Sequence, residues 1–148
     1  METIDCSIRE LFLELTEEIQ LALDRDGNIK YINPRGCEML GMEEKNILGL
    51  NWFDHFFEKA LKDEVKGVYL ELIKGNIEFQ EYFENKIVCS QGEPRMISWH
   101  NHAIYDDDGN ITLVLSSGLD ITREKHIEAE LIEANMKVEA LLEETQNL

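Results

Sequence analysis

The sequence predicts an α+β fold with five strands, which form antiparallel hairpins within a group of two and a group of three. Five segments alternate apolar and polar residues with a period of two, which is typical of strands with one buried face. Segments of helical period separate a group of two strands from a group of three. Asp-Gly turns join neighbouring strands in both groups, and a short turn of this kind connects antiparallel strands.

The first part of the chain is predicted to hold a flanking helix and a hairpin. Residues 7–16 ("SIRELFLELT") have the apolar period of an amphipathic helix, and Ser7 and Glu10 make a capping box at its start. The hairpin of residues 19–33 follows. Residues 34–41 ("PRGCEMLG") begin with proline and end with glycine, which predicts one or two helical turns.

The middle of the chain is predicted to be helical, and three strands follow it. We expect loop and short helical pieces over residues 43–57, and the longest internal helix over residues 58–74, with Gly75 at its C-terminal end. The apolar face of that helix comprises Leu61, Val65, Val68 and Leu72. The three strands are expected at residues 82–89, 95–105 and 111–121.

Two loops of similar sequence, "DRDGN" (residues 24–28) and "DDDGN" (residues 106–110), contain the acidic residues of a calcium loop. An EF-hand loop needs oxygen ligands at its first position and a glutamate at its twelfth, with glycine at the sixth. With Gly109 at the sixth position, Ile104 and Leu115 occupy the two ends, and the other loop fails in the same way. Asp-Gly between alternating segments instead predicts a hairpin turn, because glycine accepts the positive φ that the turn requires.

The last predicted helix, residues 122–148, carries a heptad pattern. Thr122 is its expected N-cap, and Glu124 in the first turn suits the helix dipole. Apolar residues then recur at alternating steps of four and three, and about half of the other positions are charged. The seam consists of Ile127, Leu131, Ala134, Val138, Leu141, Thr145 and Leu148. We expect this stripe to face another helix, and therefore a homodimer through the N- and C-terminal helices; a terminal helix packed on its own domain is the alternative.

Composition and charge exclude several classes of protein. The net charge of −17 over 148 residues argues against nucleic acid and anionic membrane surfaces as partners, since both attract cationic residues. No apolar run approaches the ~20 residues that span a bilayer, and the acidic N-terminus lacks the apolar region of a signal peptide. Cys6, Cys37 and Cys89 lack the spacing of a zinc site and are unpaired by count, which fits a reducing, cytoplasmic location.

Three stretches together resemble the PAS domain, the PAS/PAC sensory box of bacterial and archaeal signalling proteins. They are "LALDRDGNIKYINPRGCEMLG", "GLNWFDHFF" and "ISWHNHAIYDDDGNITLVLSSGLDIT", the last of which runs into the charged helix. The resemblance divides the chain into a flanking helix (residues 1–18), a PAS domain (residues 19–122) and a signalling coiled-coil helix (residues 123–148).

The resemblance implies a five-stranded antiparallel sheet with helices packed across one face, enclosing a pocket that can hold a small ligand. It also implies an effector domain C-terminal to the coiled coil in the parent protein, commonly a histidine kinase. Asp120, Ile121 and Thr122 match the motif at which such domains pass into the signalling helix, and we expect these residues to relay the signal.

The cofactors of the family are not matched by these residues. Flavin-binding members carry a reactive cysteine in a stretch that corresponds here to Asn51-Trp52-Phe53-Asp54, and a glutamine where this chain has Gly118, so we expect no flavin. Haem-binding members place a histidine on the long helix, whereas His55 precedes it here, so we expect no haem.

Two further histidines, His100 and His102, lie two apart and share one face of a strand. We expect that face to be the outer one, because the family alignment turns Ile97, Trp99, Asn101 and Ala103 inward. No carboxylate or thiol at a defined spacing completes a metal site with the two histidines, so we expect no metal.

The expected inner surface is mostly apolar. It comprises Met39, Leu40, Trp52, Phe56, Leu61, Val65, Ile87, Ile97, Trp99, Asn101, Val114, Ser116 and Gly118. From this set we expect a ligand to contact Trp52, Phe56, Ile97, Trp99, Asn101, Ser116 and Gly118. Asn101 and Ser116 are the polar members, and they either hold a small polar ligand or a water molecule, or bond to each other in a filled core.

No catalytic motif is present. The chain has no nucleophile elbow, phosphate-binding loop or zinc-protease motif, and His126 lacks the surroundings of a kinase phosphoacceptor. The sequence therefore predicts a non-enzymatic sensory module that acts through a coiled coil. A ligand-free dimerisation module and a haem- or metal-based redox or gas sensor remain as alternatives.

Overall fold

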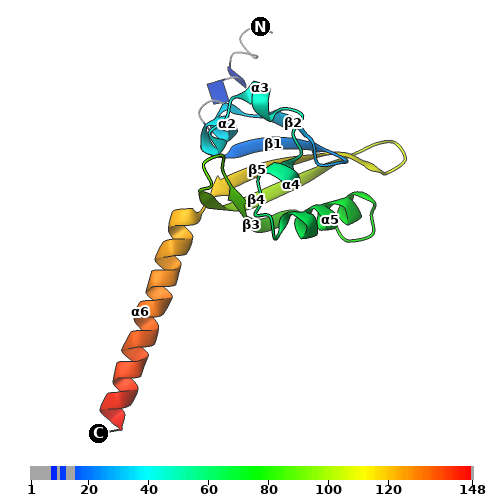
Figure 1. The fold of residues 1–148 in the computed structure, drawn as a ribbon. Coiled ribbons are helices and arrows are strands. Elements are labelled where there is room, and N and C mark those ends of the chain that lie inside the picture. The colour runs from blue at the N-terminus through cyan, green and yellow to red at the C-terminus, as the bar shows by residue number, and fades with distance from the viewer. Residues whose placement is uncertain (1–7, 10, 13–15, 148) are drawn as a thin grey trace.

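The computed structural model describes residues 8–9, 11–12 and 16–147. Five strands form one antiparallel sheet, which confirms what the resemblance implies, and their order is β2-β1-β5-β4-β3 (Figure 1). The strands are β1 (Ile19–Asp24), β2 (Ile29–Ile32), β3 (Tyr82–Val88), β4 (Pro94–Tyr105) and β5 (Ile111–Asp120). The last strand thus lies at the centre of the sheet, between the first strand and β4.

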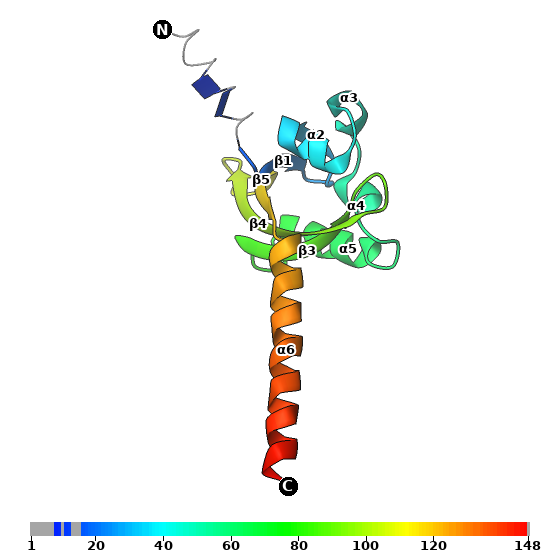
Figure 2. The same cartoon turned by 90° about the vertical axis from the view of Figure 1, so that its left-hand side faces the viewer.

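Four short helices cover one face of the sheet, and a long one leaves it (Figure 2). The helices are α2 (Pro34–Leu40), α3 (Glu44–Ile47), α4 (Trp52–His55), α5 (Lys62–Ile73) and α6 (Thr122–Gln146). The helix α2 begins where predicted, because Pro34 occupies its first turn and the side chain of Asn33 accepts a hydrogen bond from the Gly36 N–H. It ends at Gly41, whose φ is 72°.

Both Asp-Gly loops are hairpin turns with the same hydrogen bonds. Asp24 Oδ1 accepts the N–H groups of Asp26 and Asn28 at 3.0 and 2.9 Å. Asp106 Oδ1 accepts those of Asp108 and Asn110, both at 2.9 Å. Gly27 and Gly109 follow at φ values of 88° and 83°. Oδ1 of each aspartate is therefore hydrogen-bonded within its own turn. In the second turn, the hydrogen bonds from Asn110 and Asp108 lower the pKa of Asp106.

The core fills the space between the sheet and α2–α4. Its buried members come from alternate positions of the strands and from the aromatic segment around α4. They are Ile19, Leu21, Leu23, Ile29, Ile32, Leu40, Ile47, Trp52, Phe53, Phe56, Phe57, Ile87, Cys89, Ile97 and Trp99. A smaller cluster of Ile73, Ala103, Ile111 and Val114 lies at the end of α5.

The long helix α6 projects from the sheet without packing on it (Figure 1). None of its residues is buried, and Ile127, Leu131, Val138 and Leu141 are each more than half exposed. The alternative of a terminal helix packed on its own domain is therefore wrong. Ala134 is also exposed, whereas Leu148 lies outside the described residues.

Two helix starts differ from the predictions. The helix α5 begins at Lys62 rather than at residue 58, because Glu58–Leu61 forms a turn in which the Leu61 N–H donates to the Glu58 carbonyl. Thr122 is not the N-cap of α6 but its first residue, and its hydroxyl accepts the Met96 N–H instead of a helix N–H.

The predicted N-terminal helix lies largely outside the described residues, together with Ser7, Glu10 and Cys6. Residues 8–9 and 11–12 are helical. Across the described ranges, no helix has both the length and the apolar content needed to cross a membrane.

A pair of glycine substitutions tests the packing of the sheet. We expect Gly118→Ala to lower the free energy of unfolding by about 1–3 kcal/mol, because the added Cβ would lie 2.5 Å from Trp99 Cζ3 and 2.7 Å from Ile97 Cγ2. Gly67→Ala on α5 meets no atom within 4 Å and is expected to stabilise by about 0.5–1 kcal/mol. Urea denaturation measures both, and a Gly118→Ala protein as stable as the parent would contradict this packing.

Candidate functional site

A cavity of about 330 Å³ lies between the inner face of the sheet and the helices α4 and α5. Its wall is mostly apolar and aromatic. The lining residues are Leu21, Leu23, Trp52, Phe53, Leu61, Glu64, Val65, Val68, Tyr69, Leu72, Phe79, Gln80, Phe83, Asn85, Trp99, Asn101, Val114 and Ser116. The exposed fractions of Leu61 (41%), Val68 (52%) and Phe83 (44%) show that the cavity is open between α5 and β3.

Two tryptophans form one end of the cavity. The rings of Trp52 and Trp99 meet edge to face at 5.7 Å and 90°. Trp99 Nε1 donates to Asn85 Oδ1 at 2.7 Å, which satisfies the buried indole N–H. On the next strand Gly118 pairs with Trp99, and the indole ring occupies the space beside the glycine Cα. The ring therefore closes this end.

A polar group interrupts the apolar wall where β4 meets β5. Ser116 and Asn101 are directly opposite each other in the ladder, and the Ser116 hydroxyl donates to Asn101 Oδ1 at 2.7 Å. Asn101 Nδ2 donates to the Gln80 carbonyl at 3.2 Å. The expected hydrogen bond between Asn101 and Ser116 is thus present. The core around the pair is not filled, however, because the open cavity lies beside it.

Tyr69 crosses from α5 to the first hairpin. Its hydroxyl donates to the Asp24 carbonyl at 2.7 Å, and its ring packs on Phe53 with centroids 4.8 Å apart. Burial raises the pKa of Tyr69 above the usual value, and the charges of Asp24 and Asp26 raise it further. The phenol therefore stays neutral and holds α5 over the cavity.

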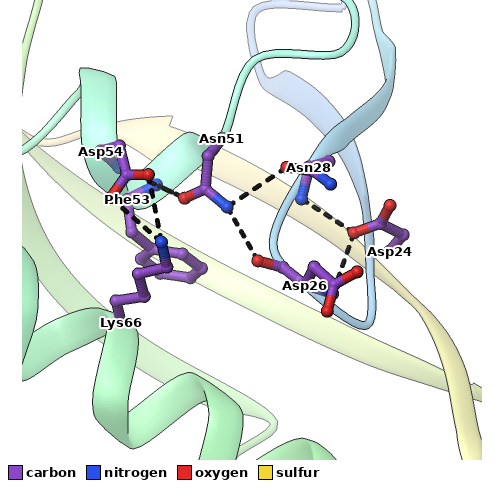
Figure 3. Close-up of polar contacts among 7 residues, drawn as sticks. All are labelled: Asp24, Asp26, Asn28, Asn51, Phe53, Asp54 and Lys66. Atoms are coloured by element: carbon purple, nitrogen blue, oxygen red, sulfur yellow. Dashed lines mark hydrogen bonds and ion pairs between the residues drawn. The ribbon is translucent and has the colours of Figure 1, made fainter.

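Asn51 positions the aromatic residues of α4 (Figure 3). Its Oδ1 accepts the N–H groups of Phe53 and Asp54 at 3.1 and 3.3 Å, while its Nδ2 donates to the Asp26 carbonyl at 2.8 Å. One side chain thus caps α4 and joins it to the first turn. Lys66 then connects α5 to α4 through an ion pair with Asp54 at 3.1 Å.

A second polar cluster joins the sheet to α6. Asp120 accepts the Thr122 N–H at 3.0 Å and the Thr122 hydroxyl, and it pairs with Arg95 at 3.3 Å. Thr122 Oγ1 accepts the Met96 N–H at 2.9 Å, and the Ile121 N–H donates to the Met96 carbonyl at 2.9 Å. Asp120, Ile121 and Thr122, the residues expected to relay a signal, are therefore all bonded to each other or to the start of β4.

Four of the seven expected ligand contacts line the cavity, namely Trp52, Trp99, Asn101 and Ser116. Phe56 and Ile97 do not, because they are fully buried in the core. Gly118 does not, because the Trp99 ring covers it. Of the wider inner surface, Met39, Leu40 and Ile87 also lie outside the lining.

Several lining residues were missed by the sequence analysis. Leu21 and Leu23 on β1, and Phe83 and Asn85 on β3, lie on the inner face by the same alternation that identified Trp99 and Asn101. Phe79 and Gln80 precede β3 in a segment without regular structure, so no periodic signal marks them.

The histidines lie away from the cavity. His100 and His102 are exposed, whereas Ile97, Trp99 and Ala103 are buried, which confirms the expected alternation along β4. His100 stacks on Tyr82 at 4.6 Å and contacts Glu81 at 3.0 Å. In the described part of the chain, no three His, Cys, Asp or Glu side chains are grouped as a metal site would require.

The sheet order, the helices on one face and the cavity between them define a sensory fold of the PAS type. The family model described as "PAS fold" matches residues 13–126, so this chain belongs to the PAS family. Members of this family serve as sensory domains of signalling proteins. No curated protein sequence matches the chain.

Solved structures of three PAS domains are similar to this chain. A PAS domain of an HTR-like protein from Haloarcula marismortui is 21% identical, with 80% of this chain and 93% of that one covered, at a TM-score of 0.61. The PAS domain of the quorum-sensing receptor RpfR from Cronobacter turicensis, in complex with C12:0, is 23% identical with 72% and 96% covered, at 0.60. A sensory box histidine kinase/response regulator from Burkholderia thailandensis is 13% identical with 89% and 98% covered, at 0.65.

The pH dependence of stability tests the role of Tyr69. Tyr69→Phe is expected to lower the free energy of unfolding at neutral pH by about 1 kcal/mol through the lost hydrogen bond. Because the folded-state pKa is raised, the parent keeps the tyrosine contribution below the unfolded pKa of about 10 and loses it as the pH rises toward the folded pKa. The difference between parent and variant should therefore shrink above that pH in urea titrations. A difference that stays constant or grows would contradict the buried, neutral phenol.

Proposed function

We propose that this chain is the ligand-sensing module of a signalling protein, acting in the cytoplasm as a dimer. An apolar small molecule binds in the cavity, and its presence changes the contacts of Asp120, Ile121 and Thr122. The seam of α6 pairs with that of a second copy and passes the change to a C-terminal effector, such as a histidine kinase.

One observation carries this proposal: a single strand joins the cavity to the helix. Val114 and Ser116 on β5 line the cavity, β5 ends at Asp120, and α6 begins at Thr122. A ligand that displaces Ser116 thus acts four residues from the Asp120 carboxylate. Because the strand is bonded on both sides, to β1 and to β4, such a displacement is transmitted along it.

The likeness to RpfR supports an apolar ligand as a class. That PAS domain shares the fold and has been solved with C12:0 bound. The lining of the present cavity, with six aromatic side chains, suits a hydrocarbon chain by the same chemistry.

A second candidate is a dimerisation module that binds no ligand. It is favoured by the exposed seam of α6, which needs a partner helix whether or not the cavity is occupied. The two candidates differ in what the purified protein retains.

Native mass spectrometry distinguishes the two candidates. We expect a mass in excess of the bare chains that disappears on denaturation, because an apolar ligand in this cavity is shielded from water on most sides. The excess should be lost in a Ser116→Trp variant, whose side chain fills the cavity, while folding is checked by circular dichroism. A parent protein of bare mass, unchanged after incubation with apolar compounds, would favour the dimerisation module.

Substitutions in α6 test the dimer. We expect the parent to be dimeric at concentrations on the order of 10 µM, and Leu131→Ser with Val138→Ser to shift it toward monomer, since both residues belong to the seam. Ile132→Ser with Met136→Ser is the matched control, because these residues are equally exposed on the same helix but lie outside the heptad seam. Analytical ultracentrifugation measures the association. A monomeric parent, or equal effects of the two double variants, would disprove pairing through the seam.

A further inference from the structure

Among the described residues, those that line the cavity include none with a positive charge. Glu64, at the rim, is the one acidic or basic side chain among its lining residues, and no lysine, arginine or histidine belongs to them. Lys66, on the same helix, already pairs with Asp54 at 3.1 Å. Arg25 donates to the Ile111 carbonyl at 3.0 Å. A negatively charged ligand would therefore meet a carboxylate and no cation.

The wall of the cavity also has few hydrogen-bond donors. The partner of an asparagine side chain shows which amide atom is the oxygen and which is the nitrogen. An indole N–H can only donate, so the Asn85 atom that faces Trp99 Nε1 must be the oxygen, as found. Asn85 Nδ2 is then left as a donor. This Nδ2 makes no hydrogen bond within the described residues. Because every fully buried side-chain nitrogen or oxygen there has a partner, Nδ2 is not fully buried. Asn85 lines the cavity, so its Nδ2 can donate to a ligand.

The other polar groups of the wall offer acceptors. A backbone carbonyl can only accept, so Asn101 must direct its Nδ2 to the Gln80 carbonyl and its Oδ1 to Ser116. The single hydroxyl proton of Ser116 is therefore donated to Asn101, and Ser116 Oγ can still accept a hydrogen bond from a ligand. The cavity thus presents the amide groups of Asn85 and Gln80 as donors, and Ser116 Oγ and Asn101 Oδ1 as acceptors.

We propose that this cavity selects an uncharged ligand, a mostly apolar molecule with one alcohol or primary amide group, over the carboxylate of the same chain length. This inference rests on the proposed function. An alcohol or amide brings no charge, and it either accepts from an amide donor such as Asn85 Nδ2 or donates to Ser116 Oγ or Asn101 Oδ1. A carboxylate can only accept, so it cannot donate to the two acceptor oxygens. It also brings a second negative charge near Glu64, and no cation among the described lining residues pairs with it.

Intrinsic fluorescence measures this selection directly. The chain has two tryptophans, Trp52 and Trp99, and both line the cavity. The whole chain is titrated with 1-dodecanol, dodecanamide and dodecanoate at about pH 8, where the acid is ionised. We expect the alcohol and the amide to bind at least about tenfold more tightly than the carboxylate.

Reversing one charge at the rim tests the electrostatic cause. Glu64→Lys removes the carboxylate and supplies a cation, which can form about one charge-assisted hydrogen bond with dodecanoate. Dodecanoate should therefore bind several-fold more tightly to the variant, and the difference in affinity between dodecanoate and the two uncharged compounds should become smaller. Asp63→Lys is the matched control: Asp63 is also exposed in the first turn of α5 but does not line the cavity. Its titrations should match those of the parent.

The outcomes separate this inference from the proposed function. Dodecanoate binding as tight as that of the alcohol and amide in the parent would overturn the selection and leave the apolar pocket standing. Equal effects of Glu64→Lys and Asp63→Lys would overturn the role of Glu64. No response to any of the three compounds would overturn the apolar pocket itself, and this inference with it.

Discussion

The cavity depends on the contact between the indole of Trp99 and the backbone of Gly118. The ring can lie flat on β5 only because no Cβ stands in its place. From there it closes one end of the cavity, meets Trp52 edge to face and directs the amide of Asn85. An aromatic side chain elsewhere on β4 would not donate to Asn85 Oδ1, and the orientation of the Asn85 amide would then not be fixed. The packing of one ring on one glycine therefore closes one end of the cavity and fixes the orientation of the Asn85 amide.

The strand β4 connects this packing to the helix. Trp99 and Asn101, on its inner face, line the cavity, and Met96, three residues before Trp99, bonds to Ile121 and Thr122 at the start of α6. Arg95, its neighbour, pairs with Asp120. The central strands β4 and β5 thus each contact the cavity at one point and the helix at another. Few side chains lie between the two sites, and all of them belong to one hydrogen-bonded ladder.

Local sequence patterns sufficed to predict the strands, the turns and the direction of most side chains. The alternation in "ISWHNHA" placed Trp99 and Asn101 on one face, the family resemblance identified that face as the inner one, and the repeated Asp-Gly phrase identified both hairpins. The open cavity itself could not be predicted, because it depends on how far α5 stands from the sheet. Phe56 and Ile97 were expected on the inner surface, but the patterns could not show which inner residues reach the cavity and which fill the core. Thr122 has a residue type common at N-caps, and only the tertiary contact with Met96 shows that its oxygen is used elsewhere.

The length of α6 gives it a mechanical property. The helix has 25 residues, and at a rise of 1.5 Å per residue it is about 37 Å long. It is also fixed at one end only, through its first residues and an ion pair between Lys125 and Glu84 at 3.3 Å. A tilt of about 5° at Thr122 would move the far end by about 3 Å, more than half of one helical turn. The helix therefore has the geometry of a lever arm, in which rearrangements too small to alter the packing of the sheet become displacements of its far end.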